Sequence, residues 1–242
     1  EANQGEVAAV IMEAARSSLP EPGFLQGVRE LTERHGVVLI FDEVVTGFRL
    51  ALGGAQEYFG VLPDMATYAK TLSNGFALGA VVGKREVMEP ARDMFISSVY
   101  WAEATGLAAG LASVRAMRDV NPSATVWALG KHFMNSMNQL AERLELPFTC
   151  AGLPPFPFIR FTHENAKLNQ ELTTLYIQEM ARRGVFAYTV NYFCFEHSQR
   201  DLYDVLEAVG ETFDVIAKAL QCGDVKSFLE CPVRQADFRR LV

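Results

Sequence analysis

A strand–helix–strand pattern near the start of the chain is the feature that most constrains its fold. Residues 6–12 (EVAAVIM) and 37–41 (VVLIF) are short apolar runs, as expected of buried strands. Between them, PGFLQGVRELTERHG places its apolar residues on one face of a helix that stops at Gly36. A right-handed crossover through such a helix makes the two strands parallel. The pattern predicts an α/β domain whose ligands bind at the carboxyl ends of its strands.

Further patterns extend this domain. The short apolar stretch MATYA directly precedes Lys70, and GAVVG follows it, so each predicts a strand. Residues 102–144 are rich in Ala, Leu and Met and predict one long helix. We expect residues 1–135 to form part of a large domain with a mostly parallel sheet.

The composition changes after this helix. Four prolines fall between Pro147 and Pro157. Helical patterns over residues 168–183 and 202–220 flank an aromatic strand pattern, VFAYTVNYFCF. We expect residues 136–242 to form a smaller carboxyl-terminal α+β domain.

Charge and composition narrow the class of partner. The formal net charge is -7, the pI is about 5.2, and Lys and Arg are not clustered, which argues against nucleic-acid binding. No apolar run approaches the roughly 20 residues of a membrane span, and EANQGEVAAV lacks the regions of a signal peptide. The 4 cysteines show no CxxC pair, which predicts reduced thiols and no metal site. We expect a cytoplasmic protein whose partners are small molecules.

Two carboxylates, Asp42 and Glu43, follow the second strand pattern. An ionised carboxylate at the end of a buried strand calls for a positive partner. One candidate is a nucleotide site in which Asp42 binds Mg²⁺, but the GxxxxGK[ST] loop of such a site is absent from this sequence. The other is pyridoxal phosphate, whose protonated ring nitrogen pairs with a buried Asp and whose chemistry requires a lysine. Lys70, after the next strand pattern, would lie at the same sheet edge.

Three long segments carry a resemblance to a known family. PGFLQGVRELTERHGVVLIFDEVVTGFR, GGAQEYFGVLPDMATYAK and SNGFALGAVVGK together resemble the class III aminotransferases, in the branch similar to glutamate-1-semialdehyde aminomutase. The resemblance is close over residues 8–110 and looser beyond. It implies a fold type I pyridoxal-phosphate transferase. In such an enzyme Lys70 would form the internal aldimine, Asp42 would pair with the pyridinium nitrogen, and Val44 would pack on one face of the ring.

The resemblance also implies a homodimer with active sites shared between subunits. In FISSVYWAEATG the family often has a threonine that donates to the phosphate bound by the other subunit, and Val99 stands at that position. Ser97, Ser98 or the backbone amide of Val99 would then bind the phosphate. The family's glycine-rich phosphate loop and its ring-stacking aromatic residue lie upstream of the first residue. We therefore expect the carboxyl-terminal part of a larger enzyme, with the large domain incomplete on its amino-terminal side.

The sequence is compatible with two related reactions, intermolecular and intramolecular amino transfer. The aminomutase usually has a triple glycine after its lysine and an Asn-Pro pair in the later phosphate-binding segment, where this chain has SNGFALGAVVGK and YWAEATG. These differences favour an aminotransferase acting between an amino donor and a carbonyl acceptor over an intramolecular aminomutase. A truncated, non-catalytic homologue is a third hypothesis. Arg49 and Arg160 are candidates for binding a substrate carboxylate, although structural ion pairs are the commoner role of such residues.

Overall fold

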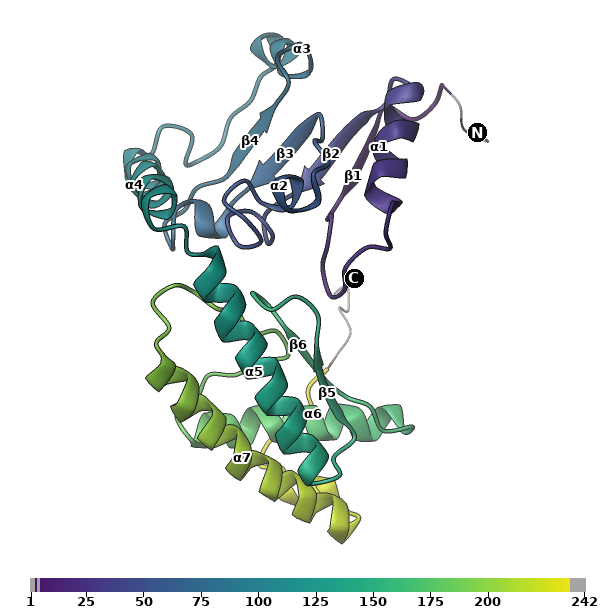
Figure 1. Cartoon of the computed structure of the whole chain (residues 1–242), viewed down its shortest axis with the longest axis vertical. Coiled ribbons are helices and arrows are strands. Elements are labelled where there is room, and N and C mark those ends of the chain that lie inside the picture. Colours follow the sequence, from purple (N-terminus) through teal and green to yellow (C-terminus); the bar gives the residue numbers. More distant parts are fainter. Residues whose placement is uncertain (1–2, 4, 236–242) are drawn as a thin grey trace. The chain divides into compact units, whose positions relative to one another are not determined.

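The computed structural model describes residue 3 and residues 5–235, which belong to two compact units (Figure 1). We call Glu1–Ala124 the amino-terminal unit and Thr125–Val242 the carboxyl-terminal unit. The division falls at the start of helix α5 (Ser123–Arg143), earlier than the expected boundary at residue 135. The reason is that α5 contributes buried side chains, including Phe133, to the core of the carboxyl-terminal unit. All but the first two residues of α5 therefore belong to the carboxyl-terminal unit.

The amino-terminal unit is built on a sheet with the strand order β1-β2-β3-β4. The strands are β1 (Ala9–Met12), β2 (Val38–Asp42), β3 (Met65–Tyr68) and β4 (Ala80–Gly83). The first three are parallel, and β4 is antiparallel to β3. Helix α1 (Phe24–Arg34) connects β1 to β2, as the strand–helix–strand pattern predicts. The prediction of an α/β fold with a mostly parallel sheet is confirmed.

The remaining helices of this unit show where one prediction fails. They are α2 (Ala55–Phe59), the 3-10 helix η1 (Lys70–Leu72), α3 (Arg85–Met88), the 3-10 helix η2 (Glu89–Asp93) and α4 (Ala104–Val120). The prediction of a single helix over residues 102–144 is wrong, because α4 ends before Asn121 and α5 begins after Pro122. Asn121 adopts a left-handed backbone with φ of 42°. Proline disfavours a helical conformation in the residue before it, so the helix breaks here.

A buried carboxylate anchors the edge of the sheet opposite the carboxyl ends of β2 and β3. Asp64, which is 8% exposed, directly precedes β3 and accepts a hydrogen bond from the Leu39 N–H at 2.8 Å. Its carboxylate also pairs with Arg29 at 2.9 Å and with Lys84 at 2.8 Å. Burial alone would raise the pKa of Asp64, but the bonds from Lys84, Leu39 and Arg29 outweigh it and lower the pKa to about 2. These contacts tie α1, β2 and the end of β4 together.

The carboxyl-terminal unit combines three long helices with a two-stranded antiparallel sheet (Figure 1). The helices are α5, α6 (Ala166–Arg182) and α7 (Gln199–Cys222), the strands are β5 (Phe148–Ala151) and β6 (Phe158–Phe161), and a 3-10 helix, η3 (Val225–Phe228), follows. The two helices predicted in this region are confirmed as α6 and α7. Within the described residues, no helix has both the length and the apolar character that crossing a membrane requires.

The aromatic segment, residues 185–195, is not the strand that its sequence predicts. Only Val190 forms a bridge, with Phe158 of β6. The carbonyl groups of Pro155 and Pro157, just before β6, accept hydrogen bonds from the segment at 3.0 Å each. Because proline has no N–H to donate in return, the ladder cannot continue along this side, and the segment remains irregular.

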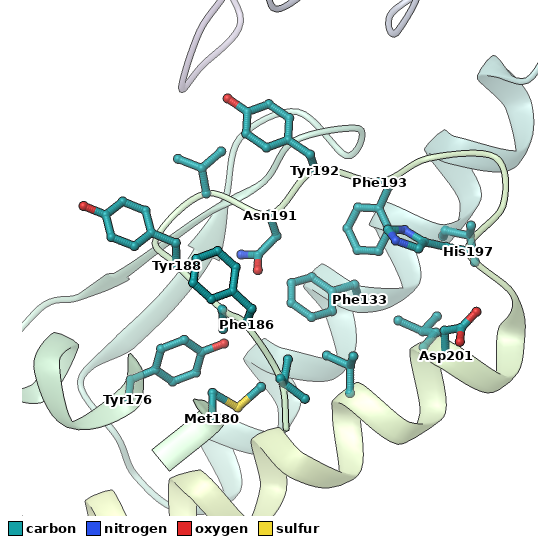
Figure 2. Close-up of a pocket in the computed structure, with 16 residues that line it drawn as sticks. Phe133, Tyr176, Met180, Phe186, Tyr188, Asn191, Tyr192, Phe193, His197 and Asp201 are labelled. Atoms are coloured by element: carbon teal, nitrogen blue, oxygen red, sulfur yellow. The ribbon is translucent and has the colours of Figure 1, made fainter. Parts of the chain in front are cut away.

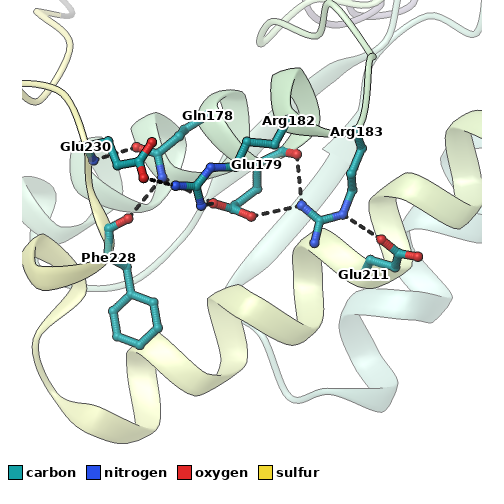
Figure 3. A network of polar contacts seen from close by, with 7 residues as sticks. All are labelled: Gln178, Glu179, Arg182, Arg183, Glu211, Phe228 and Glu230. Atoms are coloured by element: carbon teal, nitrogen blue, oxygen red, sulfur yellow. Dashed lines mark hydrogen bonds and ion pairs between the residues drawn. The ribbon is translucent and has the colours of Figure 1, made fainter.

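A polar network around Glu179 fixes the end of α6 (Figure 3). Glu179 is 3% exposed, and its carboxylate accepts hydrogen bonds from Arg183 at 2.8 Å and Arg182 at 2.5 Å. Burial acts to raise the pKa of Glu179, but the bonds from Arg183 and its neighbours outweigh it and hold the pKa below its usual value. Arg183 also reaches Glu211 of α7 at 2.8 Å, and Arg182 pairs with Glu230. The network therefore joins α6 to α7 and to the segment after η3.

Candidate active site

Asp42 and Lys70 lie at the same edge of the sheet. Asp42 is the last residue of β2 and pairs in register with Thr67 of the parallel strand β3. Lys70 begins η1, directly after β3. The carboxyl ends of adjacent parallel strands are where open α/β sheets bind ligands. The structure thus places both predicted residues at the edge that the sequence indicates.

The Asp42 carboxylate is oriented through one of its two oxygens. Oδ1 accepts a hydrogen bond from the Val44 N–H at 3.0 Å and a longer one from the Thr67 hydroxyl at 3.4 Å. Oδ2 has no hydrogen-bond or ion-pair partner among residues 5–235. Of the two oxygens, Oδ1 is therefore the one engaged by the described residues. Sequence reasoning missed Thr67, which is identified only by the register of β2 with β3.

The backbone at Lys70 is strained, and hydrogen bonds between residues of the following turn stabilise that turn. Lys70 has φ of 48°, a left-handed conformation that is uncommon outside glycine. Its carbonyl oxygen accepts from the N–H groups of Ser73 at 3.3 Å and Asn74 at 3.1 Å. Ser73 is 1% exposed, and its hydroxyl donates to the Phe76 carbonyl at 2.5 Å. The Lys70 side chain is exposed, so its amine is accessible. Strain of this kind is concentrated at functional sites.

Glu43 has a different role from the acid beside it. Its side chain is buried, with 1% exposed, and accepts hydrogen bonds from the Thr46 hydroxyl at 2.5 Å and from the N–H groups of Ala55 at 2.9 Å and Gln56 at 3.0 Å. These amides open helix α2, where the helix dipole also favours a negative charge. A Cβ at Gly54 would lie 2.5 Å from Glu43, so this close approach requires glycine. The carboxylate therefore closes the loop after β2.

Tyr68 supports the same loop from β3, and sequence reasoning did not find it. Its hydroxyl accepts a hydrogen bond from Gln56 Nε2 at 2.5 Å, and its ring lies 5.5 Å from that of Phe48. Burial, followed by the nearby charge of Glu43, raises the pKa of Tyr68 to about 12. The phenol is therefore neutral at physiological pH. It links the loop after β2 to β3, the strand that precedes Lys70.

The other predicted cofactor-binding residues have fewer contacts with Asp42 and Lys70. Val44 follows Asp42 by two residues in the same loop and is partly buried. Ser98 and Val99 lie in a turn in which the Ser98 carbonyl accepts from the Trp101 N–H at 3.2 Å, and Val99 is 93% exposed. Within the described part of the chain, no hydrogen bond or ion pair joins either residue to Asp42 or Lys70.

The two candidate arginines lie in different surroundings. Arg49 donates to the Val45 carbonyl at 2.7 Å and so braces the loop after β2. Arg160 is exposed on β6 of the carboxyl-terminal unit, opposite Thr149. In residue 3 and residues 5–235, no group of three or more His, Cys, Asp or Glu side chains is arranged to hold a metal ion.

Comparison with known proteins identifies the family. The model of the family Aminotransferase class-III matches residues 1–191. The chain is 34% identical over 229 residues to a 3-aminobutyryl-CoA aminotransferase of Cloacimonas acidaminovorans, covering 91% of this chain and 55% of the relative. It is 33% identical over 223 residues to glutamate-1-semialdehyde 2,1-aminomutase 2 of Lachnoclostridium phytofermentans, covering 84% of this chain and 52% of the relative. The chain thus spans about half the length of the curated relatives it matches.

Solved structures share the fold. The FumI protein of Sphingopyxis sp. MTA144, in its PLP internal aldimine form, matches with a TM-score of 0.84 at 23% identity, covering 91% of this chain and 54% of that protein. An omega-transaminase from Sphaerobacter thermophilus matches with a TM-score of 0.80 at 23% identity, covering 90% of this chain and 54% of that protein. At this identity the likeness shows the fold alone, and it confirms the predicted fold type I transferase architecture. With the family model matched over residues 1–191, the chain belongs to the class III aminotransferases.

Proposed function

We propose that the chain is the lysine-bearing part of a pyridoxal 5'-phosphate-dependent aminotransferase, which moves an amino group between an amino donor and a carbonyl acceptor. The observation that carries the proposal is the placement of Asp42 and Lys70 at the carboxyl ends of two adjacent parallel strands. Membership of the class III aminotransferases supports the same assignment. When bound, the cofactor supplies an aldehyde and an electron-accepting ring.

The side chains at this sheet edge fit that cofactor. Asp42 Oδ1 is engaged by Val44 and Thr67, while Oδ2 remains to accept a hydrogen bond from a protonated ring nitrogen. A cationic ring is the positive partner that a partly buried carboxylate calls for. Val44, in the loop directly after Asp42, would pack its methyl groups on one face of the ring.

Lys70 would hold the cofactor covalently through Nζ. When an amino substrate displaces it, the freed Nζ would accept and return the proton that amino transfer moves. The exposed side chain leaves Nζ accessible to both reactants. The left-handed backbone at Lys70 and the buried Ser73 support this role, because they would hold the lysine at the sheet edge.

The proposal includes a cytoplasmic homodimer with shared active sites. Residues 94–101 expose large apolar side chains, among them Phe95 at 98%, Val99 at 93% and Trp101 at 66%. Exposed apolar groups at this density are typical of protein interfaces. Ser98 and Val99 would then bind the phosphate held by the other subunit. The other partners would be small molecules, with no nucleic acid.

An intramolecular aminomutase is the second candidate. It is favoured by the 33% identity over 223 residues to glutamate-1-semialdehyde 2,1-aminomutase 2. Both reactions would use Asp42 and Lys70 in the same way and differ in whether the reacting molecule leaves the site midway. Separate amino donors and carbonyl acceptors distinguish them, because only an aminotransferase passes the amino group from one molecule to the other.

Absorbance in the presence of pyridoxal phosphate tests the proposal. The chain should gain an absorbance band at about 420 nm that borohydride removes, because Lys70 binds the aldehyde of the cofactor. Lys70→Ala should lack the band, whereas Lys131→Ala, which changes an exposed lysine of α5, should retain it. A non-catalytic homologue would show no band in any of these proteins, and that result would contradict the proposal.

A further inference from the structure

The carboxyl-terminal unit contains a large, mostly apolar cavity of about 740 Å³ (Figure 2). Its walls include Phe133 of α5, Tyr176 and Met180 of α6, and Val205 of α7, and residues 185–193 close one side. Pockets that bind small organic molecules generally enclose about 300–1,000 Å³ and have predominantly apolar walls. The size and lining of this cavity therefore suit a ligand of that kind.

Hydrogen-bond donors meet inside this cavity. Asn191 Nδ2 is buried and has no hydrogen-bond partner among the described residues. Figure 2 shows the Asn191 amide and the Tyr176 hydroxyl pointing into the same space. Burial, with a smaller effect of Cys150, raises the pKa of Tyr176, so its hydroxyl keeps the proton that it can donate. An unpartnered buried donor is destabilising unless a ligand or water accepts from it.

The rim adds one more donor and disfavours anions. His197 Nδ1 accepts from the Cys194 N–H at 3.3 Å, so a neutral imidazole carries its proton on Nε2. Asp201 also lines the cavity, and its carboxylate already accepts from the Ser198 N–H at 2.8 Å and hydroxyl at 2.7 Å. A ligand carboxylate would meet this negative charge and the apolar walls, which both oppose it.

We infer that this cavity binds an uncharged aromatic compound that carries a carbonyl oxygen. The carbonyl would accept from Asn191 Nδ2, and the aromatic body would lie between Phe133 and the ring of Phe186. Phe186 is 101% exposed although it lines the cavity, so a bound ring would cover apolar surface that now faces solvent. The inference is drawn from residues of the carboxyl-terminal unit alone and does not rest on the proposed amino transfer.

Three naphthalene probes of one shape test this inference on the full chain. 2-Acetonaphthone has the carbonyl, 2-ethylnaphthalene lacks it, and 2-naphthoate replaces it with an anion. Binding is measured in a Lys70→Ala background, so that a ketone cannot react with Lys70. Saturation-transfer NMR reports binding. The methyl resonance of Met180, assigned by comparison with Met180→Leu, shows whether the probe lies in the cavity. We expect the ketone to bind at least about fivefold more tightly than the hydrocarbon and the anion most weakly.

Two variants separate recognition by Asn191 from non-specific apolar binding. Asn191→Leu keeps the side-chain shape without the donor, so it should abolish the preference for the ketone and leave the hydrocarbon bound. Val205→Trp should fill the cavity and remove all binding, with circular dichroism showing whether the fold is kept. An equal affinity for ketone and hydrocarbon, or a preference that survives Asn191→Leu, would overturn the inference. So would probes that bind without shifting the Met180 methyl resonance.

Discussion

Asp42 Oδ1 accepts a hydrogen bond from the main-chain N–H of Val44 at 3.0 Å. This bond, with the Thr67 hydroxyl at 3.4 Å, orients a carboxylate whose second oxygen has no partner among residues 5–235. Replacing that carboxylate by an amide preserves an acceptor for Val44 but removes the charge. The role of Asp42 can therefore be separated into structure and electrostatics.

Asp42→Asn should leave the fold intact and remove most of the activity. A neutral amide no longer favours a protonated cofactor ring, so we expect a loss of about 100-fold or more in turnover. Cofactor titration should show weaker binding, and the melting temperature without cofactor should be unchanged. Asp93→Asn, at an exposed position, serves as the control. Normal turnover in Asp42→Asn would mean that Asp42 is structural only.

Glu43→Ala should destabilise the amino-terminal unit. The substitution leaves the N–H groups of Ala55 and Gln56 without their acceptor, and we expect a loss of about 2–4 kcal/mol in the free energy of unfolding. Glu30→Ala removes an exposed acid of α1 and should change this value by less than about 0.5 kcal/mol. Urea denaturation measures both. Equal stability of the two variants would exclude the proposed loop-closing role of Glu43.

The Asp64 ion pairs should make stability fall in acid. Because the pKa of Asp64 is lowered to about 2 from an ordinary 3.8, the folded state binds fewer protons than the unfolded state between these values. Its contribution, about 2 kcal/mol, is complete above pH 5 and is lost as the pH falls from about 4 to 2. Asp64→Asn should be less stable than the natural chain at pH 7, and the difference should narrow over that range. A constant difference would contradict the assignment.

Substitutions at Val99 test the shared site. Val99→Thr supplies the hydroxyl donor expected near the other subunit's phosphate and should tighten cofactor binding by about 1 kcal/mol. Val99→Trp should weaken both cofactor binding and dimerisation, whereas Leu62→Trp, at a position 65% exposed before β3, should change neither. Sedimentation and cofactor titration provide the measurements. A monomer that binds the cofactor equally well with either Val99 substitution would refute the shared site.

The elements that the sequence predicted well are those set by local pattern. The strand ending at Asp42 and the turn beginning at Lys70 follow from short apolar runs with polar residues at their ends. The prediction of a strand over residues 185–195 failed. The aromatic pattern of these residues is typical of a strand, but the prolines before β6 prevent the pairing. The prediction also missed the helix break at Asn121, because the helix-favouring composition on both sides outweighed the signal of one proline.

Partners distant in sequence could not be predicted from local pattern. Asp64 pairs with Arg29 and Lys84, which lie far from it in the sequence on either side. These residues meet only when α1 and the strands of the sheet pack together. The sequence indicated no structural role for Glu43, because its amide partners in α2 come close only when the loop after β2 closes. The Gly-Gly pair before α2 was the available signal, since close approach of a buried side chain to the backbone favours glycine.

The most direct test of the central claim is to identify the lysine that binds the cofactor. The chain is incubated with pyridoxal phosphate, reduced with borohydride and digested, and the modified peptide is located by mass spectrometry. We predict one modified peptide, the one that contains Lys70, and its disappearance in Lys70→Ala but not in Lys131→Ala. Modification spread over other lysines, or persisting at the same level in Lys70→Ala, would contradict the proposal that Lys70 and Asp42 form a pyridoxal phosphate site.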